Sequence, residues 1–219
     1  MQGFPEKPVR MRQPVLTDMC FKADLSDANR DEYVARLVQK QKELGYTLLT
    51  DGEFNRTFWH LDFFWGFGGV THETGGDVAF NGETARLDRV YLKGKLTAQP
   101  HPFIEAYKRL KQLEDASHIA KLTVPSPAQF FQQLTIPQNF LGTKAIYPST
   151  DDLIRDIAAL YQDFIRQFYA VGGRYLQFDD CTWGAVVGDA AAQRYQNLNC
   201  NLDFVKDQLL RVNNLALEG

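Results

Sequence analysis

The strongest constraint on the fold of this chain is a predicted long amphipathic helix. It ends at a glycine pair and is followed by a short apolar segment and two carboxylates. Ser149-Thr150-Asp151-Asp152 is a capping signal, and apolar residues follow at three- and four-residue spacing as far as Gly172-Gly173. Tyr175-Leu176-Gln177-Phe178 then runs into Asp179-Asp180. This pattern predicts a strand that is buried on both faces and carries charge into a cleft at its C-terminal end. Helix, glycine stop, strand and polar loop together are one step of a parallel sheet.

An earlier segment has the same form. Asn29 and Glu32 are a plausible cap pair for a helix with a mostly apolar stripe, and Gly45 ends that helix. A short strand is predicted over 46–50. It leads directly into Asp51-Gly52-Glu53, so a second strand is expected to end in carboxylates.

A third step follows, and the chain closes on a helix. Residues 102–113 predict a helix, and the strand over 118–124 is broken sharply by Pro125-Ser126-Pro127. A last helix is expected over 202–215. Repeated helix-to-strand steps are typical of a (β/α) barrel or a doubly wound sheet. The fold expected is α/β of the (β/α)8 TIM-barrel type, and it is incomplete in this chain because only three secure strands are found where the barrel needs eight.

The domain organisation expected is one partial barrel domain over 1–219. Within it, 1–28 form an irregular arm rich in proline and basic residues, and 70–98 form a hairpin-like insertion with Asn81-Gly82 as the turn. Residues 54–67 are dense in aromatic side chains, which either line a pocket or pack a lid against the sheet.

The composition narrows the class of function. A hydrophobic content of 44% with a formal charge of -3 leaves no basic surface for nucleic acid, and no apolar run approaches the roughly 20 residues that span a bilayer. Cys20, Cys181 and Cys200 are odd in number and lack C-x-x-C spacing. A cytoplasmic enzyme or binding protein for small molecules is therefore expected, with no membrane or nucleic-acid partner.

Carboxylates at the ends of two predicted strands are the main candidates for a site. If the strands belong to one parallel sheet, Glu53, Asp179 and Asp180 face one mouth, where they could hold an ammonium group, a metal or a proton. The alternative is that some of them cap helices or pair with Arg56. Because neighbouring side chains of a strand alternate, one of the two aspartates is expected to be structural.

Two further residues have a structural and a functional interpretation. His60, among aromatic residues, is either an acid/base group or a packed side chain, and packing is favoured. Cys181 is expected to be a buried small apolar residue, because no second Cys or His is nearby. No complete metal site is visible, and no catalytic residue is assigned.

Three motifs resemble the cobalamin-independent methionine synthase family, and most of all its shorter, single-barrel relatives of the methionine synthase II-like type. They occur in the family's order: Thr50-Asp51-Gly52-Glu53-Phe54-Asn55-Arg56 with Trp59-His60-Leu61-Asp62-Phe63, then Ala120-Lys121-Leu122-Thr123-Val124-Pro125-Ser126-Pro127, then Leu176-Gln177-Phe178-Asp179-Asp180-Cys181-Thr182-Trp183-Gly184. The resemblance covers roughly Val34 to the C-terminus.

The resemblance implies a (β/α)8 barrel that acts as a 5-methyltetrahydropteroyltriglutamate-homocysteine S-methyltransferase in methionine biosynthesis. Such an enzyme moves a methyl group from a methylated folate to the thiol of homocysteine, and zinc holds the thiolate. By resemblance, Glu53 binds the amino group of the amino acid and Asp179 assists it. Asp180 occupies the family's second acidic position. The same resemblance places three cleft-lining side chains at Trp59, His60 and Trp183.

The chain departs from the family in two places. The family's zinc ligands include a His-x-Cys pair, a Glu and another Cys on later strands, and this chain stops at Gly219 before them. It is therefore expected to lack catalytic zinc, although the full-length family uses it. The glycine-serine-phenylalanine turn of the first strand is also absent. Gln2-Gly3-Phe4-Pro5 matches that turn only weakly.

Other functions stay open at this point. One is a sister activity of the same superfamily, either corrinoid-linked methyl transfer or decarboxylation of a porphyrin precursor. A porphyrin pocket would need arginines for the propionates, and only Arg56 lies near a motif. Another is a non-catalytic binding or assembly protein, since an open barrel exposes strand edges that favour a homo-oligomer.

Overall fold

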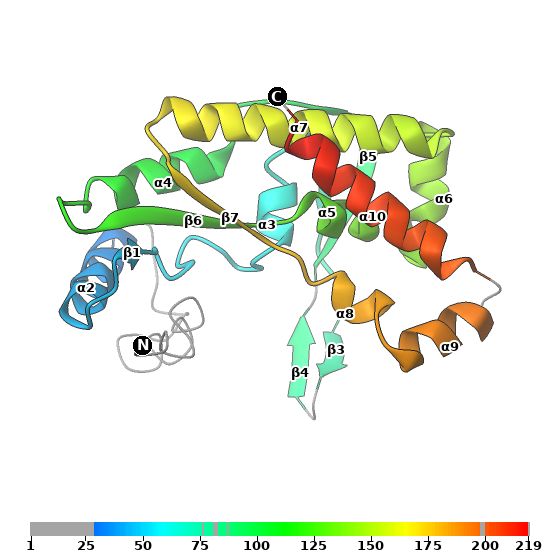
Figure 1. Cartoon of the computed structure of the whole chain (residues 1–219), viewed down its shortest axis with the longest axis horizontal. Coiled ribbons are helices and arrows are strands. Elements are labelled where there is room, and N and C mark those ends of the chain that lie inside the picture. Colours follow the sequence, from blue (N-terminus) through cyan, green and yellow to red (C-terminus); the bar gives the residue numbers. More distant parts are fainter. Residues whose placement is uncertain (1–28, 76, 81–82, 87, 198–199, 219) are drawn as a thin grey trace. The chain divides into compact units, whose positions relative to one another are not determined.

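The computed structural model describes residues 29–75, 77–80, 83–86, 88–197 and 200–218, and they form a mixed α/β structure (Figure 1). The irregular arm predicted over 1–28 and the turn at Asn81-Gly82 lie outside the described residues. The helices are α2 (Arg30–Glu43), α3 (Leu61–Phe64), α4 (Pro102–Lys111), α5 (Pro127–Thr135), α6 (Pro137–Ile146), α7 (Thr150–Ala170), α8 (Trp183–Val186), α9 (Asp189–Asn197) and α10 (Leu202–Ala216). None of these helices has the length and apolar character needed to cross a lipid bilayer.

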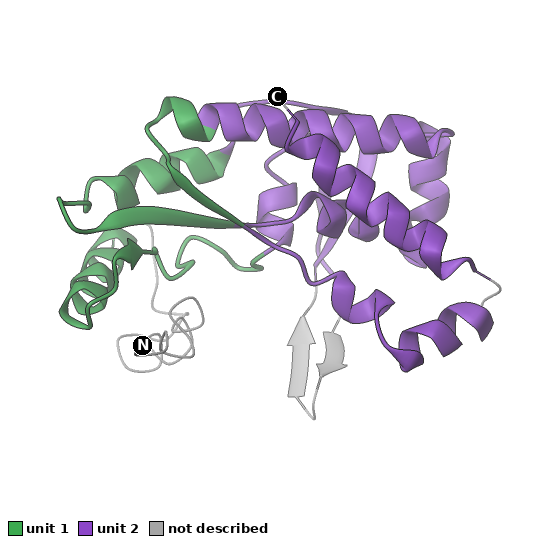
Figure 2. Ribbon diagram, in the orientation of Figure 1, with its two compact units in different colours: residues 1–59, 102–123, 168–177 green, residues 60–101, 124–167, 178–219 purple. Residues whose placement is uncertain are grey.

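The chain divides into two compact units (Figure 2). The first unit combines three stretches of the sequence and the second combines the other three. Unit 1 comprises residues 1–59, 102–123 and 168–177, and unit 2 comprises 60–101, 124–167 and 178–219.

A three-stranded sheet has the order β1-β6-β7, with β1 at Leu48–Leu49, β6 at Ile119–Pro125 and β7 at Tyr175–Asp179. β1 and β6 are parallel, with Leu48 opposite Ile119 and Leu49 opposite Ala120. The Ile119 N–H also donates to the Thr47 carbonyl at 2.8 Å. Three strands and the helices before them thus lie close to their predicted positions, and a parallel pair is confirmed. β1 is shorter than the predicted 46–50.

The burial predicted for β7 is wrong. Tyr175 is 43% exposed, and the other four residues of the strand are only half-buried. By contrast, every residue of β6 after Ile119 is buried. The difference follows from position, because in the described residues β7 ends the order of the sheet and has a strand on one side only. An apolar run of this length cannot by itself distinguish an edge strand from a central one.

The insertion contains two antiparallel pairs in unit 2. β2 (Gly68–Glu73) pairs with β5 (Arg89–Thr97), and the register shifts between Gly68 and Val70. β3 (Asp77–Phe80) pairs with β4 (Glu83–Arg86). Gly69 lies at the shift with φ 84, and a Cβ there would come within 2.2 Å of the Lys95 carbonyl oxygen. Glycine is needed at this bulge for both reasons.

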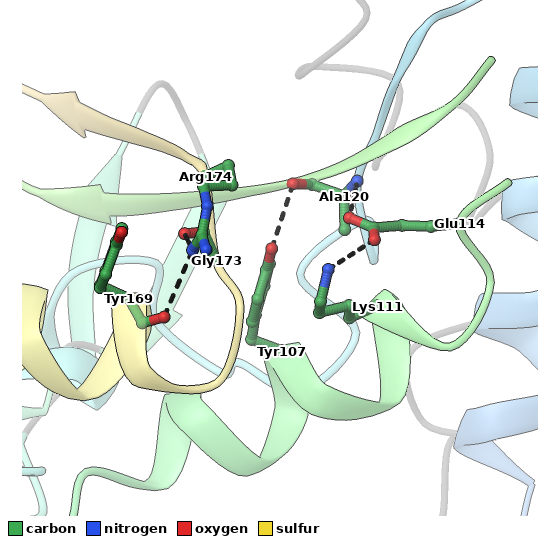
Figure 3. A network of polar contacts seen from close by, with 7 residues as sticks. All are labelled: Tyr107, Lys111, Glu114, Ala120, Tyr169, Gly173 and Arg174. Atoms are coloured by element: carbon green, nitrogen blue, oxygen red, sulfur yellow. Dashed lines mark hydrogen bonds and ion pairs between the residues drawn. The ribbon is translucent and has the colours of Figure 1, made fainter. Parts of the chain in front are cut away.

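A polar network in unit 1 connects α4 with the start of β6 (Figure 3). The Glu114 carboxylate accepts from Lys111 Nζ at 2.6 Å and from the Ala120 N–H at 2.8 Å. The Tyr107 hydroxyl donates to the Ala120 carbonyl at 3.4 Å, and burial, with the charge of Glu114, raises the pKa of Tyr107 to about 12. The network satisfies the backbone of β6 where the strand begins.

Aromatic rings fill the core of unit 2. Phe63 packs edge-on against Phe67 and Phe164 at centroid distances of 5.2 and 4.9 Å, and it lies 4.5 Å from the His101 ring. Phe64 stacks on Phe130 at 4.5 Å. The phenylalanines at 63, 64 and 67 are fully buried or nearly so. This part of the aromatic segment is therefore packed core.

Helix caps agree with the sequence in one case and differ in another. Ser149 accepts from the Asp152 N–H at 3.3 Å, as the capping signal predicts. The Asn29 side chain makes no capping hydrogen bond to α2. The prediction that Asn29 and Glu32 form a cap pair is therefore wrong. Ser126 caps α5 by accepting from the Gln129 N–H at 3.0 Å, with Pro127 as the first helical residue.

Tyr147 provides a first testable prediction about stability. Its hydroxyl donates to Asp156 at 2.6 Å and accepts from the Leu96 N–H at 2.8 Å, and its side chain is buried. Tyr147→Phe is expected to lower the free energy of unfolding by about 2 kcal/mol, because it leaves a buried N–H without an acceptor. Urea unfolding measures this loss. Tyr169→Phe removes a hydroxyl from a residue that is 64% exposed and should change stability by less than about 0.5 kcal/mol. Equal effects of the two changes would contradict the prediction.

Candidate functional site

The end of β1 is fixed by a side chain of α2. The Gln41 amide nitrogen donates to the Thr50 carbonyl at 2.8 Å, and its oxygen accepts from the Thr50 N–H at 2.9 Å. Gln41 is buried in the apolar stripe of α2. A polar side chain on this stripe therefore completes the backbone bonding of the residue where the strand gives way to the turn.

The turn Asp51-Gly52-Glu53 has a constrained backbone. Asp51 accepts from the Glu53 N–H at 2.9 Å and from the Asn55 amide at 3.0 Å. Gly52 has φ 65, and a Cβ there would lie 2.4 Å from a methyl carbon of Leu37. Glu53 follows with φ 58, a left-handed conformation that costs a non-glycine residue of the order of 1 kcal/mol. Residues with strained backbone of this kind cluster at functional sites.

Arg56 holds the carboxylate of Glu53. Its guanidinium lies 3.4 Å from Glu53 Oε1, and the side chains are 2% and 14% exposed. Arg56 also donates to the carbonyls of Thr123 and Trp59 and lies 4.5 Å above the Phe103 ring. The pairing with Arg56 that the sequence left open is therefore present, and Arg56 itself is more buried than its partner.

A small hollow opens beside this turn. Its volume is about 10 Å³, close to the space that one water molecule needs. Seven residues of unit 1 line it: Thr50, Asp51, Gly52, Glu53, Arg56, Lys121 and Thr123. Lys121 lies on β6 and donates to the Gln177 amide oxygen at 2.9 Å. The hollow is bordered by two formally negative and two formally positive side chains, so it is polar and balanced in charge.

Trp59 and His60 follow this turn in the sequence. Trp59 is half-buried and contributes its carbonyl to Arg56. His60 begins unit 2 and packs edge-on against Phe64, with ring centroids 6.0 Å apart. Burial lowers the pKa of His60 to about 4. The ring is thus neutral at pH 7, in agreement with the interpretation of a packed histidine.

In unit 2, Asp180 is surrounded by donors from its own chain. Oδ1 accepts from the Thr182 N–H at 3.0 Å and from the Thr182 hydroxyl. Oδ2 accepts from the Trp183 indole N–H at 3.2 Å and from the Asn213 amide at 2.8 Å. Asn213 in turn accepts from the Ala128 N–H at 2.9 Å, so the carboxylate joins the loop after β7 to α10 and α5.

Asp179 is the last residue of β7 and is half-buried. Its carbonyl accepts from the Ser126 N–H at 2.8 Å, at the point where β6 gives way to α5. The structure thus brings Asp180 and Trp183 together in unit 2 with Asp179 next in sequence. It brings Glu53 and Trp59 together in unit 1 through their shared partner Arg56.

Both cysteines of the described residues lie at the surface. Cys181 and Cys200 are both exposed, so the prediction that Cys181 is a buried small apolar residue is wrong. Thr182, not Cys181, fills the buried position in this loop. Among the described residues, no group of three or more His, Cys, Asp or Glu side chains is placed to hold a metal ion.

Two residues of this region, Lys121 and Asp51, were not singled out from the sequence. A signal for Lys121 was present, since it is the single charged residue within the mostly apolar run Ile119–Pro125. A buried lysine in such a strand is expected to have a partner or a function. Asp51 was included in the turn motif, but its role in shaping the turn depends on the backbone.

The sequence is similar to two proteins of Bacillus subtilis. The chain is 34% identical to the uncharacterized protein YxjH of Bacillus subtilis over 169 residues, and 30% identical to YxjG of the same organism over 200 residues. These alignments cover 75% and 88% of the chain but 42% and 50% of the relatives. The chain thus spans about half the length of the curated relatives that it matches. No protein-family model matches the chain.

Among solved structures, the chain is similar to a candidate vitamin-B12-independent methionine synthase from Listeria monocytogenes. The TM-score is 0.66 at 26% identity, and the match covers 94% of the chain and 56% of that protein. The chain is therefore similar to a protein of the cobalamin-independent methionine synthase type. A B12-independent methionine synthase from Shewanella, solved with selenomethionine, shares the fold at a TM-score of 0.58 and 19% identity over 88% of the chain and 49% of that protein. The resemblance identified from the three motifs is confirmed. The turn after β1 carries the first of these motifs.

Proposed function

We propose that this chain belongs to a methyltransferase of the cobalamin-independent methionine synthase type, and that it binds the amino acid whose thiol receives the methyl group. Homocysteine is the proposed acceptor, and a methylated folate is the proposed donor. The three-stranded sheet is proposed to be a section of a (β/α)8 barrel. The parallel pairing of β1 with β6 and the likeness to the Listeria protein support this proposal.

The observation that carries the proposal is the geometry of Glu53. A carboxylate at the end of a parallel strand is held in one direction by a left-handed backbone, by the Asp51 side chain and by the buried Arg56. Preorganised charge of this kind lets a site grip an ammonium group without first ordering its own side chains. Glu53 is therefore the proposed acceptor for the ammonium group of the amino acid.

Other residues have proposed roles that depend on the resemblance. Asp179, Trp59, His60 and Trp183 are proposed to contribute to substrate binding. Asp180 is proposed to position Trp183, because the indole N–H donates to its carboxylate and three further donors occupy the same group. Zinc supplies thiol activation in the family. The role proposed for the residues of this chain is to bind and orient the amino acid.

Calorimetric titration with L-homocysteine under reducing conditions tests the proposal. Glu53→Gln should weaken binding about 10- to 100-fold, which corresponds to the loss of one charged hydrogen bond. Glu43→Gln is the matched control, because it makes the same change on an exposed glutamate of α2 in unit 1. No binding by the unchanged protein, or equal affinities of both variants, would defeat the proposal.

Methyl transfer is a separate measurement. We expect a version of the chain that is extended past Gly219, to the length of its longer relatives, to form methionine from homocysteine and a methylated folate. The zinc content is determined on the same sample. An extended protein that neither holds zinc nor forms methionine would contradict the methyltransferase assignment.

A further inference from the structure

The Asp180 carboxylate accepts four hydrogen bonds from residues of unit 2. Thr182 donates twice to Oδ1, through its N–H at 3.0 Å and through its hydroxyl. Oδ2 accepts from the Trp183 indole N–H at 3.2 Å and from the Asn213 amide at 2.8 Å. An ionised carboxylate has about four acceptor positions, so these donors occupy the whole group. Asp180 therefore acts on its surroundings through the donors that it holds.

Asn213 lies on α10, which packs against α5 and α8 in unit 2 (Figure 1). Its amide nitrogen donates to Asp180, and its amide oxygen accepts from the Ala128 N–H at 2.9 Å. Ala128 belongs to the first turn of α5, where backbone N–H groups have no partner within the helix. The position thus needs a side chain that donates at one atom and accepts at the other. Asparagine meets both needs, whereas aspartate and leucine, which have a similar size, do not.

The bond from Asn213 bears directly on Trp183. The Asn213 amide and the Trp183 indole donate to the same oxygen of Asp180. Thr182, which is fully buried, holds the other oxygen in place. A change in the position of Oδ2 therefore changes where the indole N–H finds its acceptor, and Asn213 controls that position from α10.

We propose that Asn213 is a positioning residue of the candidate site: it fixes the Asp180 carboxylate and, through it, the direction of the Trp183 indole. Where it concerns ligand binding, the inference rests on the proposed function, because Trp183 is one of the side chains proposed to contribute to substrate binding. Asn213 itself does not need to touch the ligand. α10 is then the helix that holds this part of the site in place.

The isosteric change Asn213→Asp tests the bond to Asp180 by itself. The new carboxylate still accepts from the Ala128 N–H, but it places a second negative charge beside Asp180 Oδ2, where the amide nitrogen lies at 2.8 Å. Two carboxylates at about this distance do not both stay ionised without moving apart. At about pH 7.5 the repulsion should move Asp180 away from the indole, and at about pH 5 a shared proton should restore the bond in part.

Two further titratable groups lie near Asp180, and both are the same in the proteins that are compared. Asp179 is its neighbour in the chain. Burial, together with the charge of Asp180, raises the pKa of Tyr161 in α7 well above its usual value. Tyr161 therefore stays neutral over this pH range. A pH dependence that is found in Asn213→Asp and not in the unchanged protein thus belongs to the new pair of carboxylates.

Tryptophan emission and the binding of L-homocysteine are the two readouts. The chain has three tryptophans, so each variant is also made in a Trp183→Phe background, where its effect on emission should vanish. At about pH 7.5, Asn213→Asp should shift the Trp183 emission and weaken homocysteine binding about tenfold, as expected for one lost hydrogen bond to a charged group. At about pH 5, the affinity ratio between the unchanged protein and the variant should narrow by at least about threefold.

Two further variants complete the comparison. Asn213→Ala removes the donor without adding a charge, so it should shift the Trp183 emission equally at both pH values. It also provides the result if the aspartate variant does not fold at neutral pH. Asn214→Asp makes the same change on the next residue of α10, whose side chain is exposed, and should behave as the unchanged protein does.

The outcomes separate the inference from the proposed function. An unshifted Trp183 emission in both Asn213 variants would overturn the inference, and so would homocysteine binding as tight as that of the unchanged protein. A loss in Asn213→Asp that acid does not reduce would also overturn it, because damaged packing does not depend on a shared proton. If the unchanged protein does not bind homocysteine, the proposed function fails, and the emission of Trp183 alone decides whether Asn213 positions it.

Discussion

Replacing Arg56 by methionine is expected to lower the free energy of unfolding by about 3–5 kcal/mol, which is the usual cost of removing one partner of a buried ion pair. The substitution leaves the Glu53 carboxylate, only 14% exposed, without the guanidinium that lies 3.4 Å away. It also removes the donors to the carbonyls of Thr123 and Trp59. A methionine side chain fills much of the space above the Phe103 ring, so the loss arises mainly from charge and hydrogen bonding.

Chemical denaturation measures this loss, and two variants calibrate it. Arg56→Lys keeps the charge but cannot reach both carbonyls and Glu53 with one ammonium group, so an intermediate loss is expected. Arg36→Met removes an exposed arginine of α2 and should change stability by less than about 0.5 kcal/mol. If Arg56→Met were no more damaging than Arg36→Met, Arg56 would not be the group that holds the turn after β1.

The sequence predicted the elements whose pattern is long and regular. α7 and α10 have apolar stripes over many turns, and both were expected almost at their observed bounds. β1, β6 and β7 follow helices that end clearly, so their order along the chain was also predicted. In these segments the periodicity and the stop signals indicate the same structure, which makes the prediction secure.

Short helices were missed for different reasons. α6 and α9 lack a pronounced apolar face, since each buries a single residue, Thr143 and Ala191 respectively. α5 did have a signal, because Ser126 is a favourable cap and Pro127 suits the first helical position. The segment Pro125-Ser126-Pro127 was interpreted only as the end of a strand, although the same residues also begin a helix.

The site shows which of its features depend on tertiary structure. Glu53 was identified from its position after an apolar run, and its pairing with Arg56 was one of the alternatives given. The left-handed backbone of Glu53 and the clamp from Gln41 require a fold in which α2 and β1 are already placed. The exposure of Cys181 likewise depends on how the loop after β7 turns, because Thr182 takes the buried position. Sequence patterns indicate which residues share a strand end, but not which of two neighbours is buried.

His60 should make the stability of the protein depend on pH. Burial lowers its pKa from 6.5 to about 4 in the folded protein. Between these values the unfolded chain binds a proton that the folded protein does not, so the free energy of unfolding falls as pH falls. The contribution is complete above pH 6.5 and levels off below pH 4. A lowering of this size corresponds to a loss of about 2 kcal/mol between pH 7.5 and pH 4.5.

The measurement compares urea unfolding of the unchanged protein and of His60→Gln at these two pH values. Carboxylates elsewhere titrate in both proteins, so the difference between the two pH dependences isolates His60. The unchanged protein should lose about 2 kcal/mol more than the variant on acidification. Because the imidazole packs against Phe64, the variant is expected to be less stable at pH 7.5 but to approach the unchanged protein at pH 4.5. Parallel pH dependences, or a His60 resonance that titrates near 6.5 in the folded protein, would show that the ring is solvated and does not belong to the packed segment.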